Sequence, residues 1–496
     1  MKQIIFAIII LLSSNAIGQQ GLSNNWIIGY QSYTSTPYFG CTRLNFLNGA
    51  PTVTYDSIGM DFNHTHTNIS DSAGNMLFYT NGYYIADATD DTMDNGGGIN
   101  PSTYTSYFYD GLGIPQANII LPKPNDSNLY YFIHSTVDKF PGYTCSYNLY
   151  LSIIDMSQNN GLGKVITKNQ IIHTDSMQGG KISAVRHGNG RDWWIVTHGL
   201  GNDTYIKFLL TPYGLDGPFF QNIGTSLNHL GAGQALFSPD GNKYAYFWYQ
   251  DGLEVLDFDR CSGQFSNPLN VPFIYEDGYM MGTAFSPNSN LLYVSNIWHL
   301  YQLDLTAANI AASKMIVATY DSFTSGAPGW PGFATVFGLS ALAPDGKIYI
   351  TTANGTLHMH IIDQPDSPGL ACNVIQHGLQ LPAFYFNTLP NHPNYFLGDN
   401  GLCNNLGIPP APYKGVKKIQ VFGNPTNDKF TLWFPVDKDV GWLEIYDVNG
   451  ECIRREYVAQ WSQYKTVDIS NLSAGVYFCK MRWRSGEGSV SVVKIE

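Results

Sequence analysis

The feature that most constrains this chain is a short unit, an apolar strand followed by a tight turn and a second apolar strand, that recurs along it. At Ala235–Phe247 the unit reads ALFSPDGNKYAYF, and it returns at Thr283–Val294 as TAFSPNSNLLYV and at Ser340–Ile350 as SALAPDGKIYI. In such a turn Pro presets φ, Asp or Asn bonds back to the backbone, and Gly adopts a positive φ. Each copy therefore predicts a β-hairpin.

Three less regular copies precede these, at Ser70–Tyr79, Ile119–Phe132 and Ser183–Val196. The six copies lie roughly fifty to sixty residues apart, and a strand-turn-strand repeat of that length is typical of propeller blades. The 33 Tyr, 27 Phe and 50 Gly of the chain also favour β-structure with many turns. We predict an all-β chain whose main part, residues 19–405, is a β-propeller.

The number of blades follows from the two ends of this region. Trp26–Gln31 and Thr42–Phe46 resemble outer strands with no inner strand before them, and Leu381–Phe386 resembles a strand with no blade after it. Joining these segments would close the ring and remove the open sheet edges that invite aggregation. Seven blades are expected, with six or eight as alternatives.

The first residues predict export. Lys2 precedes the apolar run Ile4–Leu12, and small residues follow, which is the pattern of a signal peptide over residues 1–18 with cleavage before Gln19. The formal charge of −12 disfavours nucleic acid as a partner. Export permits disulfides, but the seven Cys are odd in number. Cys452 and Cys479 could pair, or both could be buried free thiols.

The character of the sequence changes near its C-terminus. Residues 406–416 begin LGIPPAPYKG, which is typical of a Pro-rich linker. Beyond them, residues 417–496 contain short apolar strands separated by Asn-Pro, Asn-Gly and Ser-Ala-Gly. This pattern predicts a small antiparallel β-sandwich.

The C-terminal segment also carries specific motifs in a fixed order. They are the NPT that begins at Asn424 and Pro425, the LEIYDVNG that ends at Gly450, the LSAGVY that contains Gly475 and Tyr477, and the VKI around Lys494. The segment resembles the type A sorting domain of the Bacteroidetes type IX secretion system. The resemblance implies the secretion machinery as a partner, passage across the outer membrane, removal of the domain, and a final place on the cell surface or outside the cell.

The body is similar to a Bacteroidetes surface propeller family with WD40-like and lactonase-like repeats. The stretches that carry the similarity include RHGNGRDWWIVTH at Arg186–His198 and those around Phe237–Gly241 and Pro344–Tyr349. The resemblance implies the fold and the location, and it assigns no activity.

Two stretches offer metal ligands. His64 and His66, in NHTHTN, would share one face of a strand and could hold a transition metal. Asp90, Asp91 and Asp94 lie on a Gly-rich loop with the oxygen donors that calcium prefers, although the spacing is not that of an EF-hand. The alternatives are an exposed polar strand and a solvated acidic loop. No cofactor is required by the sequence, and calcium is the ion that the acidic loop suggests.

Two further groups could bind a ligand. Lys181, His187 and His198 could bind an anionic sugar at a propeller mouth, or belong to a structural Trp/His core. The tyrosine clusters that include Tyr107, Tyr109 and Tyr143 could stack on sugars or fill a protein interface, or serve in ordinary packing between blades.

The sequence leaves two functional hypotheses. The first is a surface binding or adhesion module for a glycan or protein, and it is favoured because no G-x-S-x-G, H-E-x-x-H or P-loop motif occurs. The alternative is an enzyme in the central channel, such as a lactonase-like hydrolase or a polysaccharide lyase. That enzyme would need carboxylates, or His with a divalent ion, converging at one mouth.

Overall fold

The structure is a computed structural model of the 496-residue chain. It describes residues 21–32, 36, 38–138, 145–226, 233–248, 252–273, 282–401, 403, 415–416, 419–437, 439–448, 450–483 and 485–496. The predicted signal peptide and Tyr143 lie outside these residues. The chain divides into two compact units, Met1–Cys403 and Asn404–Glu496.

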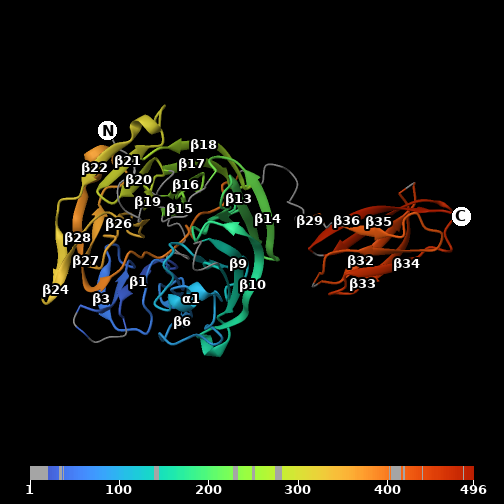
Figure 1. The fold of residues 1–496 in the computed structure, drawn as a ribbon, viewed down its shortest axis with the longest axis horizontal. Helices are drawn as coiled ribbons and strands as arrows, with labels where there is room; N and C mark the ends of the chain where they lie inside the picture. The colour runs from blue at the N-terminus through green and yellow to red at the C-terminus, as the bar shows by residue number, and fades with distance from the viewer. Residues whose placement is uncertain are drawn as a thin grey trace, which may run out of the picture. The chain divides into compact units, whose positions relative to one another are not determined.

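Seven antiparallel sheets stand around a common centre in the first unit (Figure 1). The five complete sheets have four strands, and the first two have three. The strands of blades one to three are β1 Asn25–Tyr30, β2 Gly40–Asn45 and β3 Thr52–Asp56, then β4 Thr67–Ser70, β5 Met76–Thr80 and β6 Ile85–Asp87, then β7 Asn118–Pro122, β8 Leu129–Ser135, β9 Ser146–Asp155 and β10 Lys164–Met177. Blades four and five are β11 Ser183–Arg186, β12 Trp193–His198, β13 Thr204–Thr211 and β14 Gly214–Asn222, then β15 Gly233–Phe237, β16 Lys243–Trp248, β17 Gly252–Asp259 and β18 Gln264–Val271. Blades six and seven are β19 Thr283–Phe285, β20 Leu291–Asn296, β21 His299–Asp304 and β22 Met315–Thr319, then β25 Ser340–Leu342, β26 Ile348–Ile350, β27 Thr356–Ile362 and β28 Val374–Tyr385.

A few elements lie outside the blades. The hairpin of β23 and β24 (Thr324–Ala327 and Trp330–Ala334) is inserted between blades six and seven, and helix α1 (Thr103–Tyr107) lies between blades two and three. The described residues of the unit also form three short 3₁₀ turns, namely η1 Asn159–Gly161, η2 Ala311–Ser313 and η3 Gly369–Cys372. The prediction of an all-β propeller with seven blades is confirmed.

The repeated turns join the first and second strands of blades two to seven, as the sequence predicted. In blade five, Ser238 N bonds Lys243 O, and Gly241 has a φ of 75° that a side chain would strain. The blades pack face to face through apolar rings, as in the cluster of Tyr205, Tyr244 and Phe265 between blades four and five. We call the end of the propeller that carries these turns the turn end, and the opposite end, which carries α1, the α1 end.

The first blade is built differently from the prediction. Leu381–Phe386 does not join β1 and β2, because Leu381–Tyr385 is part of β28, the outermost strand of blade seven. β1 runs opposite to β4, since Ser70 N bonds Leu22 O and Phe62 N bonds Gly29 O. Because β4 is the first strand of its blade and a second strand runs opposite to a first one, β1 has the direction of a second strand. Blade one therefore has no inner strand of its own.

Residues 387–401 and Cys403, which we call the closing segment, pass through the centre of the ring instead (Figure 1, orange). Asn387 accepts a hydrogen bond from Leu339 N at the start of blade seven, and Asn391 N bonds His66 O at the start of blade two. The segment then reaches the turn end, where Asn400 N bonds Gly188 O. It fills the missing inner place without forming a strand.

A disulfide fixes the end of the closing segment. Cys403 is bonded to Cys261, which lies in the turn between β17 and β18 of blade five. Cys452 and Cys479 are both free, because they lie on strands β33 and β35, which flank β32 on opposite sides. Cys479 is buried as one alternative expected, whereas Cys452 is exposed.

The second unit is a β-sandwich of two sheets around one apolar core that includes Phe430, Leu443 and Met481. One sheet has the order β29-β36-β35-β32-β33 and the other β30-β31-β34. The strands are β29 Gly415–Val416, β30 Gln420–Phe422, β31 Lys429–Trp433, β32 Gly441–Tyr446, β33 Cys452–Val458, β34 Tyr464–Asp468, β35 Gly475–Trp483 and β36 Gly486–Lys494. Gly415 and Val416, predicted as the end of the linker, pair in parallel with β36 and so belong to the sandwich.

Candidate functional site

The α1 end carries two exposed tyrosines held by a short helix. Ser102 caps α1 by accepting a hydrogen bond from Thr105 N, and the buried Tyr104 ring packs on Phe108 at 4.4 Å. Tyr107, the last residue of the helix, is 67% exposed, and Tyr109, just after it, is 69% exposed. Both were predicted as ligand-binding residues, and their exposure fits that hypothesis better than the alternative of packing between blades.

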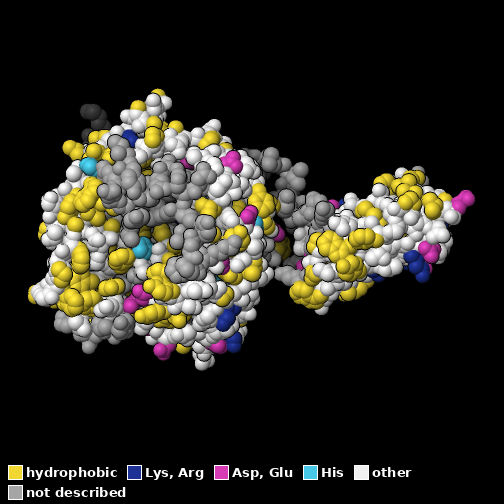
Figure 2. Space-filling view, viewed as in Figure 1, with side chains coloured by type: hydrophobic (Ala, Val, Ile, Leu, Met, Phe, Trp, Pro, Cys, Tyr) yellow, Lys and Arg dark blue, Asp and Glu magenta, His cyan; other side chains and the backbone are white. Residues whose placement is uncertain are grey.

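A cavity of about 180 Å³ lies at the same end. Its walls are Tyr30 at the end of β1, Asp61, Phe62 and Asn63 before β4, Asp110 after α1, and Phe386 after β28. Burial raises the pKa of Asp61, and the nearby Asp110 carboxylate adds to this effect. Figure 2 shows acidic side chains beside hydrophobic ones on this face of the molecule. Asp61, Asp110 and Tyr30 were not among the predicted site residues.

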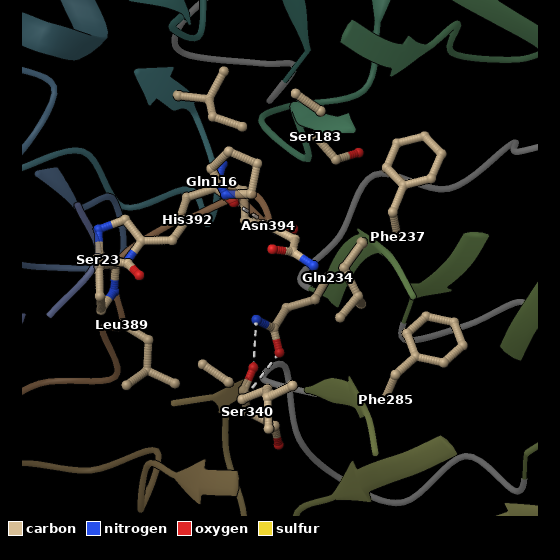
Figure 3. Close-up of a pocket in the computed structure, with 18 of the residues that line it drawn as sticks. Ser23, Gln116, Ser183, Gln234, Phe237, Phe285, Ser340, Leu389, His392 and Asn394 are labelled. Carbon is tan, nitrogen blue, oxygen red and sulfur yellow. Dashed lines mark hydrogen bonds between the residues drawn. The ribbon is translucent and has the colours of Figure 1, made fainter. Parts of the chain in front are cut away.

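A second cavity, of about 260 Å³, lies on the axis beside the closing segment (Figure 3). Gln234 accepts hydrogen bonds from Thr283 N and Ser340 N and donates to Ser340 O, which ties three inner strands together. Gln116 does the same with Ala235 N, Ala235 O and Asn391. The side-chain amides of both residues are thus hydrogen-bonded to the blades. No Asp or Glu occurs among the described residues that line the cavity. The carboxylates that a channel enzyme needs are therefore not found in this lining.

Two of the three predicted cationic residues lie together. Lys181 Nζ is 6.0 Å from the centre of the Tyr246 ring, and the His198 ring is 5.6 Å from the same ring. Both side chains are buried, and burial lowers the pKa of Lys181 to about 8 and that of His198 to about 4. His187 lies at the turn end, where its Nε2 donates to Cys261 O at 2.9 Å. The three residues thus do not form one site.

The predicted metal ligands have other surroundings. β4 begins at Thr67, so His64 and His66 precede the strand, and the expectation that they share a strand face is wrong. His64 lies against Phe386 and His66 against Phe62. Nowhere in the described part of the chain do three His, Cys, Asp or Glu side chains gather as a metal site would need.

The acidic loop is occupied by ion pairs. Asp90 accepts hydrogen bonds from Arg43 at 2.7 and 2.8 Å and from Tyr79, and Asp94 pairs with Lys164 at 2.9 Å. Asp91 is exposed, and its carbonyl oxygen accepts from Asp87 N. Because Asp90 and Asp94 pair with different cations, their carboxylates are not directed at one point. Calcium binding at this loop remains an untested prediction.

The buried histidines predict acid sensitivity. Burial lowers the pKa of His134 to about 3, and that of His64, His198, His360 and His392 to about 4. The unfolded chain therefore binds more protons than the folded one below pH 6.5, so the free energy of unfolding falls as the pH drops from 6.5 to 4. Each histidine contributes up to about 1.4 kcal/mol per pH unit in this window.

Urea unfolding at pH 7.5, 6 and 5 measures this effect. The ring of His134 bonds Asn100 and Ser152. His134→Gln removes one titrating group, so the slope of the unfolding free energy against pH should decrease by up to about 1.4 kcal/mol per pH unit, the contribution of one proton. Equal slopes in the two proteins would contradict the assignment.

The motifs of the C-terminal unit have a structural role. Asn424 donates to Ser491 O and accepts from Val493 N, which ties the Asn424-Pro425 turn to β36. Gly450 has a φ of 80° in the turn after Asp447. Gly475 pairs with Lys494, and the Tyr477 hydroxyl donates to Ser473 O. The ordered motifs therefore bring the first turn and the last strand of the sandwich together.

Comparison with known proteins identifies this unit. Residues 420–495 match the model of the secretion system C-terminal sorting domain. The chain thus carries a type IX sorting domain, which supports export to the cell surface or the extracellular space. In the described part of the chain, no helix is both long and apolar enough to cross a bilayer.

Solved structures similar to this chain share little sequence with it. A Lactobacillus plantarum protein is 14% identical over 74% of this chain and 99% of its own, with a TM-score of 0.42. A putative 6-phosphogluconolactonase from Bacteroides uniformis is 13% identical over 74% and 98%, with a TM-score of 0.36. The β-propeller domain of Myceliophteria thermophila Cps50 (Swd1) is 9% identical over 62% and 86%, with a TM-score of 0.33. The comparison with curated proteins gave no match.

Proposed function

We propose that this protein is a carbohydrate-binding propeller that the sorting domain delivers outside the cell, and that its α1 end is the binding surface. The observation that carries the proposal is the pair of exposed rings, Tyr107 and Tyr109, next to Asp110 and the cavity it lines. Exposed tyrosines supply flat apolar faces on which sugar rings stack, and carboxylates accept hydrogen bonds from hydroxyl groups.

The alternative of an enzyme in the channel has less support. The closing segment passes through the channel, and the axial cavity beside it has amide, hydroxyl and apolar walls and two histidines in its described part. His392, one of its two histidines, has its Nε2 against Asn68 O. Burial lowers the pKa of His64 and His392 to about 4, so neither carries a proton to donate at neutral pH, and the described lining offers no carboxylate as a partner for acid and base catalysis.

The test is binding by the full chain to a panel of polysaccharides, followed by thermal shift and calorimetry. A carbohydrate that binds the native state raises the melting temperature by mass action. Tyr107→Ala with Tyr109→Ala should weaken binding about tenfold or more, which is about 1.4 kcal/mol.

The matched control is Tyr213→Ala. Tyr213 is 65% exposed but lies in the turn between β13 and β14, at the turn end. Its replacement should leave the affinity unchanged. If Tyr213→Ala weakened binding as much as the double change, the α1 end would not be the binding surface. Absence of binding to every polysaccharide would count against a carbohydrate ligand.

A further inference from the structure

The cavity at the α1 end combines negative charge with aromatic walls. Asp61 and Asp110 line it together with Tyr30, Phe62 and Phe386. Four separate parts of the chain meet there, because Tyr30 ends β1, Asp61 precedes β4, Asp110 follows α1 and Phe386 follows β28. The fold, and no local motif, creates this combination.

The two carboxylates lack a cation in the described part of the chain. Asp61 Oδ1 accepts a hydrogen bond from Ser32 N at 2.5 Å, and no Lys, Arg or His among the described residues forms an ion pair with Asp61 or Asp110. Other acids of the same blades are neutralised, as Asp90 is by Arg43. Two uncompensated carboxylates at one small cavity attract a positively charged group.

The walls distinguish between kinds of cation. A calcium or magnesium ion takes six or more oxygen ligands, whereas three of the six residues that line this cavity are aromatic. Aromatic faces attract organic ammonium groups through their quadrupole, and the effect grows when the site is partly desolvated. The cavity has the volume of about six water molecules at ~30 Å³ each, which is more than an ammonium group alone needs.

We propose that this cavity binds the protonated amine of an amino sugar, so that the carbohydrate recognised at the α1 end contains glucosamine-like units. The inference rests on the proposed function, since Tyr107 and Tyr109 lie beside Asp110 and would stack on neighbouring sugar rings. The amine supplies the specificity, and the tyrosines supply contact area.

The experiment compares two ligands with the same sugar backbone, one with free, protonated amines and one in which each amine is acetylated and neutral. The full chain is titrated at pH 6 with the glucosamine hexasaccharide and with its N-acetylated counterpart. The amine form should bind at least tenfold more tightly, and the preference should decrease when salt is raised from 50 to 500 mM because screening shortens the reach of the carboxylates.

Asp61→Asn and Asp110→Asn should each reduce the preference for the amine form to about twofold or less. Asp61→Asn keeps the acceptor for Ser32 N, and Asp110→Asn, made separately, does not depend on that contact. Asp175→Asn is the control, because Asp175 is an exposed acid on β10 and should leave the preference unchanged. Melting temperatures of all variants check that they fold.

The outcomes separate the two proposals. Equal affinity for the two hexasaccharides would overturn the amine inference and leave carbohydrate binding intact. If neither hexasaccharide nor any other polysaccharide bound, the proposed function itself would be wrong. Binding of a Lys-rich peptide in place of both sugars would assign the cavity to a protein ligand, and it would overturn the amino-sugar proposal.

Discussion

Replacing Cys261 and Cys403 by serine should lower the free energy of unfolding of the propeller by about 5 kcal/mol. The disulfide joins residues 142 positions apart, and in the chain-entropy model a loop of that length restricts the unfolded state by about this amount. The bond also holds the last residue of the closing segment against blade five. The expected loss is therefore large for a single cross-link.

Urea unfolding of the oxidised full chain measures this loss. The sandwich has its own core, so its transition serves as an internal reference that should not shift. Cys452→Ser is the control, because Cys452 is exposed and free and should change neither transition. An unfolding free energy of the propeller within 1 kcal/mol of the parent value would count against this role of the disulfide. Free thiols at both positions after export would do the same.

The repeated turns predicted the architecture because each turn is a local structure. Pro, Asp and Gly fix the backbone over four residues, so six hairpins and their order could be derived without knowledge of their neighbours. The same holds for the sandwich, whose motifs lie at tight turns and at the last strand.

The closure of the ring could not be derived in this way. Residues 387–403 have no alternation of apolar and polar side chains, since they are rich in Asn and Pro and form no strand. Their hydrogen bonds go to blades two, three, four, five and seven, and such contacts leave no periodic signal. The pairing of Cys261 with Cys403 was also open, because connectivity does not follow from spacing.

The candidate site also has parts that local sequence could predict and parts that depend on contacts between distant residues. Lys181 and His198 were placed in one group because they are near in sequence, and they do meet at Tyr246, while His187 lies at the other end of the same blade. Asp61 and Asp110 are 49 positions apart and meet only through the fold. Their one local signal is an aromatic neighbour, Phe62 in the first case and Tyr109 in the second.

Asn391→Leu should destabilise the propeller by about 4 kcal/mol. The side chain of Asn391 donates to Asn118 O and Ile182 O, both at 2.8 Å, and accepts from Gln116 at 3.1 Å. Leucine has a similar volume but would remove the donor to the buried Asn118 O and Ile182 O, and each such loss costs about 1–3 kcal/mol. The side-chain contacts that join the closing segment to the first strands of blades three and four would be lost.

Two comparisons make this prediction specific. Asn394→Leu removes the hydrogen bond to Pro239 O and the exposed one from Phe396 N, at a half-buried position where solvent can replace them, and should cost only about 1 kcal/mol. Hydrogen exchange of residues 387–401 should accelerate in Asn391→Leu and remain slow in Asn394→Leu. A cost for Asn391→Leu no larger than that for Asn394→Leu would show that the closing segment does not hold the ring.

Combining Asn391→Leu with the loss of the disulfide tests whether the closing segment acts as one element. Both changes release the same residues, so once the disulfide is absent, part of what Asn391 holds in place is already loosened. The combined loss should be smaller than the sum of the two by 1 kcal/mol or more, which is the sign of coupled sites. Strict additivity would mean that the contacts at Asn391 and the disulfide at Cys403 stabilise separate parts of the propeller.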